Sequence, residues 1–161
     1  MAGRAPLGML NACLAEYDPA VARIARSARA RLHKRLPGAV ELIGDTYTGL
    51  AIGFGPTGRP KDAIISLVLY PRWVNLFFLR GTTLEDPASV LQGKGSRVRH
   101  IRLDHGSLVD DPRVARLIAR ACAQAVPSID PTARRRTITF ASTAKRRPRR
   151  PAAAGGGAAS E

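Results

Sequence analysis

The residues best suited to chemistry lie close together in the stretch Gly93–Leu103, whose sequence is GKGSRVRHIRL. Two glycines form a flexible turn, and the cations and β-branched residues that follow are typical of a strand. Cations held on a strand beside a turn form a surface that attracts anions. We therefore predict a site for an anionic ligand, built from Lys94, Arg97, Arg99, His100 and Arg102.

The alternation of side chains along this strand leaves a second interpretation open. Alternation places His100 and Arg102 on one face and Arg99 and Ile101 on the other, so neither face is purely apolar. Charges on an edge strand also prevent two sheets from pairing edge to edge. The pattern therefore fits either a ligand site or a protected edge strand. The aromatic side chains predicted to form flat walls of the ligand site are Tyr47, Tyr70 and Trp73.

The net charge of +14, from 26 cationic and 12 anionic side chains, favours anionic partners. The segment after Phe140 holds five of the cations and one acid, so residues 1–140 still carry +10. Arginine supplies 22 of the 26 cations, so a general preference for arginine in this alanine-rich chain is an alternative explanation of the positive charge. The alternative partner is nucleic acid, bound weakly and without sequence preference. Its candidate contacts are Arg134, Arg135, Arg136, Lys145, Arg146, Arg147, Arg149 and Arg150.

The sequence offers little support for metal binding or catalysis. His33, His100 and His105 have no cysteine or acidic neighbours at the spacing of a zinc site. The stretch Gly53–Gly58 matches G-x-G-x-x-G, but a further strand follows it instead of the helix that a dinucleotide site needs. We predict no catalytic residue, metal ligand or cofactor, and we interpret the chain as a non-enzymatic binding domain while leaving enzymatic activity open.

The hydrophobic pattern predicts an α+β fold. Asp18-Pro19 and Asp111-Pro112 are typical helix starts, and the helices that follow carry apolar stripes. Short β-branched or aromatic runs between and after the helices predict five or six strands, which short links should join as an antiparallel sheet. These runs cover residues 40–43, 46–54, 63–70, 73–79, 98–103 and 136–140.

These elements indicate one domain at residues 17–140, with helices at both ends packed against the sheet. Residues 1–16 form an extension or a short helix. Residues 141–161 form a disordered basic tail, Arg/Pro-rich and then Ala/Gly-rich, that buries nothing.

Two distant cysteines, Cys13 and Cys122, are typical of a reducing cytoplasm. The apolar stretch at residues 7–15 is too short for a signal peptide, and no run is long enough to cross a bilayer, so we expect a cytoplasmic protein with no membrane partner.

Several short motifs, in a fixed order, resemble the YdhG-like family of bacterial domains of unknown function. The resemblance covers about residues 20–125, and the basic stretch Ala144–Pro151 is similar to the ending of one branch of that family. The motifs are Leu36–Glu41, Gly53–Pro56, Leu69–Pro71 with Phe77-Phe78, Gly93–Gly95 and Arg99–Leu103.

The resemblance implies a two-layer domain similar to frataxin in layout, and it suggests an iron-chaperone role as an alternative function. Iron binding of that type uses an acidic ridge, because hard cations prefer clustered oxygen ligands. The first long helix here is basic instead, with Glu16 and Asp18 near its start as the only acids. Its cations are Arg23, Arg26, Arg29, Arg31, Lys34 and Arg35.

Overall fold

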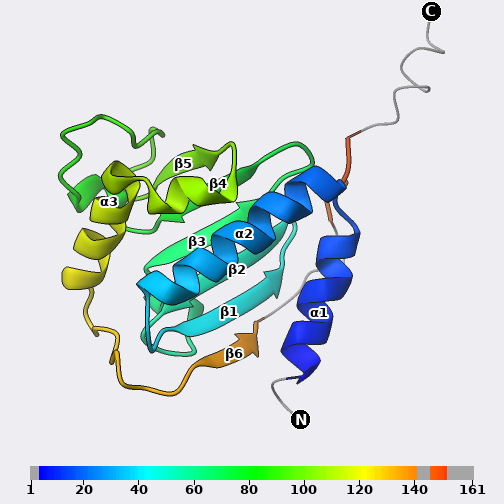
Figure 1. Ribbon diagram of the computed structural model, residues 1–161, viewed down its shortest axis with the longest axis horizontal. Coiled ribbons are helices and arrows are strands. Elements are labelled where there is room, and N and C mark those ends of the chain that lie inside the picture. The colour runs from blue at the N-terminus through cyan, green and yellow to red at the C-terminus, as the bar shows by residue number, and fades with distance from the viewer. Residues whose placement is uncertain (1–3, 141–145, 152–161) are drawn as a thin grey trace, which may run out of the picture.

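The computed structural model describes residues 4–140 and 146–151 of the chain. These residues form two layers, a sheet and helices that cover one of its faces (Figure 1). Helix α2 crosses that face, and α1 and α3 lie on either side of it. The helices are α1 (Arg4–Ala15), α2 (Pro19–Arg35) and α3 (Pro112–Ala123). The strands are β1 (Val40–Asp45), β2 (Leu50–Gly55), β3 (Ile65–Leu69), β4 (Val74–Phe78), β5 (Arg99–Leu103) and β6 (Arg136–Thr139).

Both predicted Asp-Pro helix starts are confirmed. The Asp18 carboxylate accepts a hydrogen bond from the Ala20 amide at 2.9 Å, and the Asp111 carboxylate accepts one from the Arg113 amide at the same distance. A proline occupies the first turn of each helix, where its missing N–H leaves no helical bond unmade.

The sheet has the strand order β5-β4-β3-β2-β1-β6. The first five strands form the predicted antiparallel meander, and β5 is an edge strand. The sixth strand corrects the prediction of a wholly antiparallel sheet, because β6 pairs with β1 in parallel and the sheet is mixed. Helix α3 ends on the side of the molecule where β1 starts, so the chain enters β6 in the direction of β1 (Figure 1).

The core lies between the helices and the covered face of the sheet. Register places Ile43, Ile52, Leu67 and Leu76 side by side across β1–β4, and all four are fully or almost fully buried. The predicted stripe of α3 also packs here, with Val114, Leu117, Ile118 and Ala121 buried. Leu10 and Leu14 of α1 are buried in the same core, so α1 belongs to the domain.

Part of the predicted tail lies against the domain. Residues 146–151 contact the end of α1 and the β1–β2 turn, and Arg149 is only 7% exposed. The prediction of a tail that buries nothing therefore needs correction for these six residues. Composition correctly suggests that this segment has no apolar surface to bury, but buried ion pairs and carbonyl contacts hold it instead. The other tail residues, 141–145 and 152–161, lie outside the described residues.

Candidate anion-binding site

The sheet face opposite α2 carries two rows of side chains across β2, β3, β4 and β5. One row is Gly53, Ser66, Phe77 and His100, and the other is Ala51, Val68, Asn75 and Arg102. Small residues on β2 and β3 leave a shallow hollow of about 300 Å³, with Tyr70 and Phe77 in its wall. Ser66, Val68 and Phe77 stay half-buried, so the described chain leaves this face open.

A stack of three side chains lies at one end of this face. Tyr70 and Trp73 lie across the β3–β4 hairpin with ring centroids 5.1 Å apart and planes inclined by 19°. The Tyr70 amide donates to the Trp73 carbonyl at 2.8 Å, which closes the hairpin around Pro71 and Arg72. The Arg102 guanidinium of β5 lies 5.2 Å from the centroid of the Trp73 ring, a cation–π contact. The order Arg102–Trp73–Tyr70 therefore runs from the sheet edge towards the hollow.

A second hollow, of about 420 Å³, separates the hairpin turn from the C-terminal segment. Tyr70 and Thr48 border both hollows, so the two lie next to each other. Within the described part of the chain, the residues that line the second hollow include no acid. We call the stack and the second hollow together the aromatic–arginine groove, which comprises Tyr70, Arg72, Trp73, Arg102, Arg147 and Arg150.

The side chain of Arg147 forms the wall of the groove across from the hairpin. Its guanidinium lies 5.4 Å from the centroid of the Tyr47 ring, and its amide donates to the Tyr47 carbonyl at 2.9 Å. Burial raises the pKa of the Tyr70 hydroxyl, and the charge of Arg147 acts on that pKa in the opposite direction. Both aromatic side chains at this end therefore lie close to the same cation.

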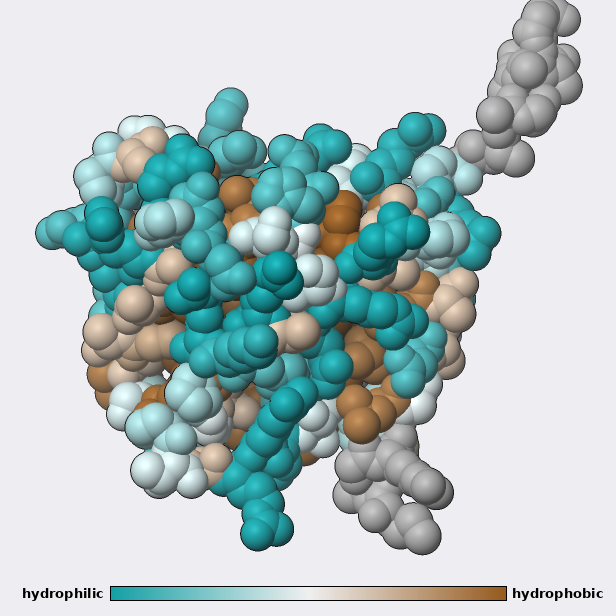
Figure 2. Space-filling model, in the orientation of Figure 1, coloured by the Kyte–Doolittle hydropathy of each residue, from teal (hydrophilic) through white to brown (hydrophobic). Residues whose placement is uncertain are grey.

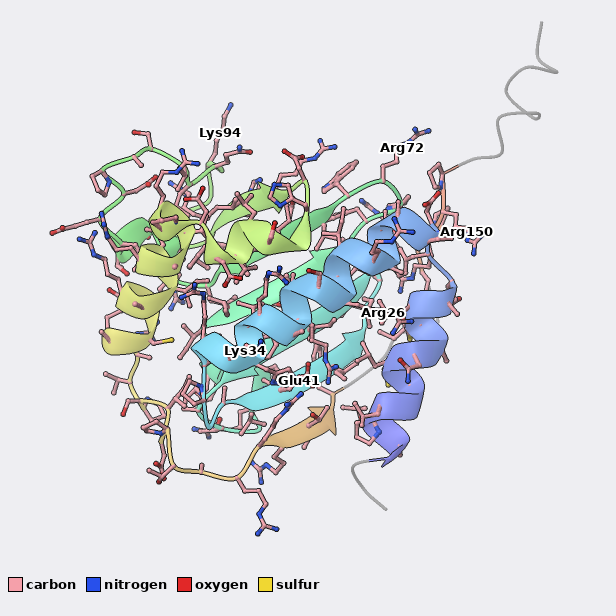
Figure 3. The ribbon with its side chains drawn as sticks, in the orientation of Figure 1. Arg26, Lys34, Glu41, Arg72, Lys94 and Arg150 are labelled. Carbon is pink, nitrogen blue, oxygen red and sulfur yellow. The ribbon has the colours of Figure 1, made fainter. Side chains whose placement is uncertain are left out.

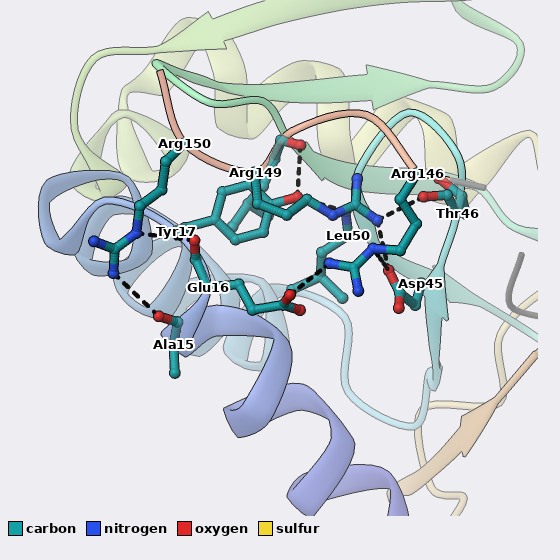
Figure 4. Close-up of polar contacts among 10 residues, drawn as sticks. Ala15, Glu16, Tyr17, Asp45, Thr46, Leu50, Arg146, Arg149 and Arg150 are labelled. Carbon is teal, nitrogen blue, oxygen red and sulfur yellow. Dashed lines mark hydrogen bonds and ion pairs between the residues drawn. The ribbon is translucent and has the colours of Figure 1, made fainter. Parts of the chain in front are cut away.

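The C-terminal segment keeps its position through a set of arginine contacts that we call the arginine clamp, namely Arg146, Arg149 and Arg150 (Figure 4). Arg149 donates to the Asp45 carboxylate at 2.5 Å and to the Thr46 carbonyl at 2.6 Å. Arg146 pairs with Glu16 at 2.7 Å. Arg150 donates to the carbonyl oxygens of Glu16 and Ala15, at the C-terminal end of α1. These carbonyls have no helical donor, and cations stabilise them.

We expect Arg149→Ala to lower the free energy of unfolding by about 3 kcal/mol, because it leaves the Asp45 carboxylate without its closest partner. The matched change Arg147→Ala should lower it by about 1 kcal/mol or less, because Arg147 is exposed and loses one cation–π contact. Urea unfolding of the full chain measures both values. Equal midpoints for the two variants and the parent chain would contradict the docking of this segment.

The residues predicted to bind the anionic ligand divide into separate groups. Arg102, Tyr70 and Trp73 meet in the stack, and Tyr47 joins the groove through Arg147. His100 lies further along the open face, with its ring 5.4 Å from that of Phe77.

The rest of the Gly93–Leu103 site lies away from the groove. Lys94 and Arg97 are exposed in the loop before β5, and Figure 3 shows Lys94 well separated from Arg72 and Arg150. Arg99 points to the other face of β5 and donates to the carbonyl oxygens of Gly95 and Val98 within its own loop. Because β5 extends for about 13 Å, one small ligand does not contact both ends.

The predicted nucleic-acid contacts also separate. Arg134, Arg135 and Arg136 are exposed near the start of β6, whereas the clamp lies beyond the other end of that strand. Arg146 and Arg149 are occupied in ion pairs, and Arg147 and Arg150 line the groove. Lys145 lies outside the described residues.

A buried acid lies under α2 and pairs with one of the cations of that helix. Arg29 and His33 of α2 approach the Glu41 carboxylate of β1 at 2.5 and 3.2 Å, and Thr137 donates to it at 2.9 Å. Burial alone would raise the pKa of Glu41, but the close approach of His33 and the hydrogen bonds from Arg29 outweigh burial and lower this pKa to about 2. Arg29 therefore belongs to the interior. The outer side of α2 remains hydrophilic (Figure 2).

The acids near the C-terminal segment are engaged with arginine. Glu16 contacts Arg146, and Asp45 contacts Arg146 and Arg149. Across residues 4–140 and 146–151, no group of three or more His, Cys, Asp or Glu side chains is placed to hold a metal ion. Burial raises the pKa of Cys122 to about 11 and also raises that of Cys13, so both thiols are poor nucleophiles.

Two residues near this surface, Arg72 and Phe77, were not among the predicted ligand contacts. Phe77 lies two residues beyond Asn75 and four beyond Trp73, so strand alternation alone indicates that these three share a face. Arg72 follows Pro71 at the hairpin corner, where a side chain projects into solvent. No comparable sequence pattern indicates that Arg147 contacts this surface, because the contact depends on how the C-terminal segment folds back.

No helix within the described residues is long and apolar enough to cross a membrane. Comparisons of the chain with protein-family models, with curated proteins and with solved structures gave no match.

Proposed function

We propose that this protein is a small binding domain that takes an anionic ligand in the aromatic–arginine groove. The observation that carries the proposal is that Arg72, Arg147 and Arg150 line one hollow whose described lining residues include no acid. These cations come from two segments about 75 residues apart in the chain, the β3–β4 turn and the C-terminal segment. A cationic concave surface raises the local concentration of anions.

The arginines of the groove differ from those that are paired with carboxylates. Arg29, Arg146 and Arg149 each contact a carboxylate within 2.8 Å, so their charge is compensated locally. Arg72 and Arg102, by contrast, are exposed, and Arg102 rests on an aromatic ring. Guanidinium groups stacked on rings keep their N–H donors available for a ligand.

We also propose that the protein works in a reducing compartment such as the cytoplasm. Cys13 and Cys122 are both free, and neither has a cysteine partner within the described chain. Free buried thiols are common where disulfides do not form.

Dextran sulfate, a polyanion without planar groups, tests the proposal. Trp73 is the only tryptophan of the chain and lies in the groove, so its fluorescence reports binding there. We expect saturable binding that weakens with salt, and Arg72→Gln with Arg147→Gln should reduce the slope of log K against log salt by about one per arginine.

The matched control is Arg134→Gln with Arg135→Gln, which removes the same charge from exposed positions near the start of β6. We expect the control to change affinity little and to leave the Trp73 signal as in the parent protein. Equal effects of the two double variants would show that net charge alone, rather than the groove, attracts polyanions.

A further inference from the structure

We infer that the ligand of the groove is single-stranded nucleic acid, with a base stacked beside Tyr70 and phosphates held by the surrounding arginines. This inference rests on the proposed function and adds the class of ligand. Its starting point is the Arg102–Trp73–Tyr70 stack, which attraction of a simple anion does not require.

The stack supplies a place for one more flat group. Trp73 covers one side of the Tyr70 ring, while Tyr70 itself borders the open hollow above β2 and β3. The floor of that hollow contains the small or short side chains of Ala51, Ser66 and Val68. A planar ring in this hollow would continue the stack by one layer, and the bases of nucleic acids stack on aromatic side chains in this way.

The cations lie where a phosphate chain would leave that layer. Arg147 lies near Tyr70 and over Tyr47, and Arg72 and Arg150 line the adjoining hollow. Figure 3 shows Arg72 and Arg150 at the same end of the molecule. An aromatic platform bordered by arginines is the arrangement with which proteins hold single strands without reading their sequence.

Duplexes and acidic proteins fit this surface less well. A base within a duplex stacks on its neighbours and cannot enter the hollow without being unpaired. Carboxylate side chains would use the arginines, but they have no ring to place beside Tyr70. The two hollows lie next to each other, an arrangement that suits a strand placed across both.

The test compares a short labelled oligothymidylate, a duplex of equal length and dextran sulfate, all with the full chain at low salt. We expect the oligothymidylate to bind most tightly and to quench Trp73 more than dextran sulfate does. With three phosphate contacts, its slope of log K against log salt should be about −2. Tyr70→Leu should weaken oligothymidylate binding about 5- to 150-fold, the range for one stacked base, and weaken dextran sulfate binding by a clearly smaller factor, because that probe has no ring to stack.

Tyr70→Phe keeps the ring and should retain the affinity for oligothymidylate, which separates stacking from loss of the hydroxyl. Equal affinity for oligothymidylate and dextran sulfate, with no effect of Tyr70→Leu, would overturn this inference and leave the proposed function standing. A duplex that binds as tightly as the single strand would also overturn it. If none of the three probes binds, the result contradicts both the proposed anion-binding function and the inference of a single-stranded ligand. If Tyr70→Leu does not fold, the quenching of Trp73 in the parent protein by the three probes still decides whether the ligand is single-stranded nucleic acid.

Discussion

Leu117→Asp should abolish the cooperative unfolding transition of this protein. Leu117 lies on α3 with 2% of its surface exposed, and it packs in the core together with Ile118. An aspartate there would bury a carboxylate without a partner, at a cost of about 5 kcal/mol or more. This cost is comparable to the whole free energy of unfolding of a small domain. Circular dichroism during heating and urea titration measures the result.

The matched control for this prediction is Arg116→Asp, which introduces the same side chain one residue earlier at an exposed position of α3. We expect a change of about 0.5 kcal/mol or less. The milder variant Leu117→Ala should fold and lose about 3 kcal/mol. A Leu117→Asp protein that unfolds at the same temperature as the parent would contradict the docking of α3.

Glu41→Gln should lower the free energy of unfolding by about 3 kcal/mol at neutral pH. The carboxylate is fully buried and receives Arg29, His33 and Thr137, so its replacement leaves buried donors without a charged acceptor. The folded-state pKa of about 2 lies below the ordinary value of 4.5, so the unfolded state takes up the proton first. The stabilisation by Glu41 is therefore complete above about pH 4.5 and is lost as the pH falls towards 2.

Urea unfolding of the parent chain and of Glu41→Gln, at several pH values, measures this stabilisation. We expect the difference between the two proteins to narrow below pH 4.5, where Glu41 of the parent is increasingly protonated on unfolding. Glu85→Gln is the control, because the Glu85 side chain is 87% exposed. A difference that stays constant from neutral to acidic pH would show that the charge of Glu41 does not provide the stability.

The elements of the fold were largely predictable because their signals are local. The Asp-Pro pairs start α2 and α3, and each strand overlaps one expected run, although β1 and β2 extend to Asp45 and Gly55, beyond the predicted ends at residues 43 and 54. The apolar stripe of α3 also follows the prediction, and the edge position of β5 agrees with one of the two interpretations of its charges. Spacing within about ten residues decides such features, through helix periodicity, strand alternation and capping.

The candidate site was only partly predictable, since it joins residues that are distant in the chain. The Gly93–Leu103 pattern drew attention to Arg102, but it equally included Lys94 and Arg97, which lie away from the groove. Arg72 and Arg147 belong to the groove because the hairpin turn and the C-terminal segment line the same hollow. The residues beside them in the sequence do not indicate that these two segments lie close together.

The amino-acid sequence by itself determined the α+β class, the helix starts, the antiparallel meander and an excess of positive charge. Only the tertiary structure decided which partner each charged side chain contacts. Arg29 pairs with Glu41 inside the domain, Arg149 pairs with Asp45 under the C-terminal segment, and Arg102 rests on Trp73 at the surface. The physical reason is that an arginine gains its stabilisation from whichever carboxylate, carbonyl or ring lies within a few ångströms. Chain topology, rather than the neighbouring residues, sets that partner.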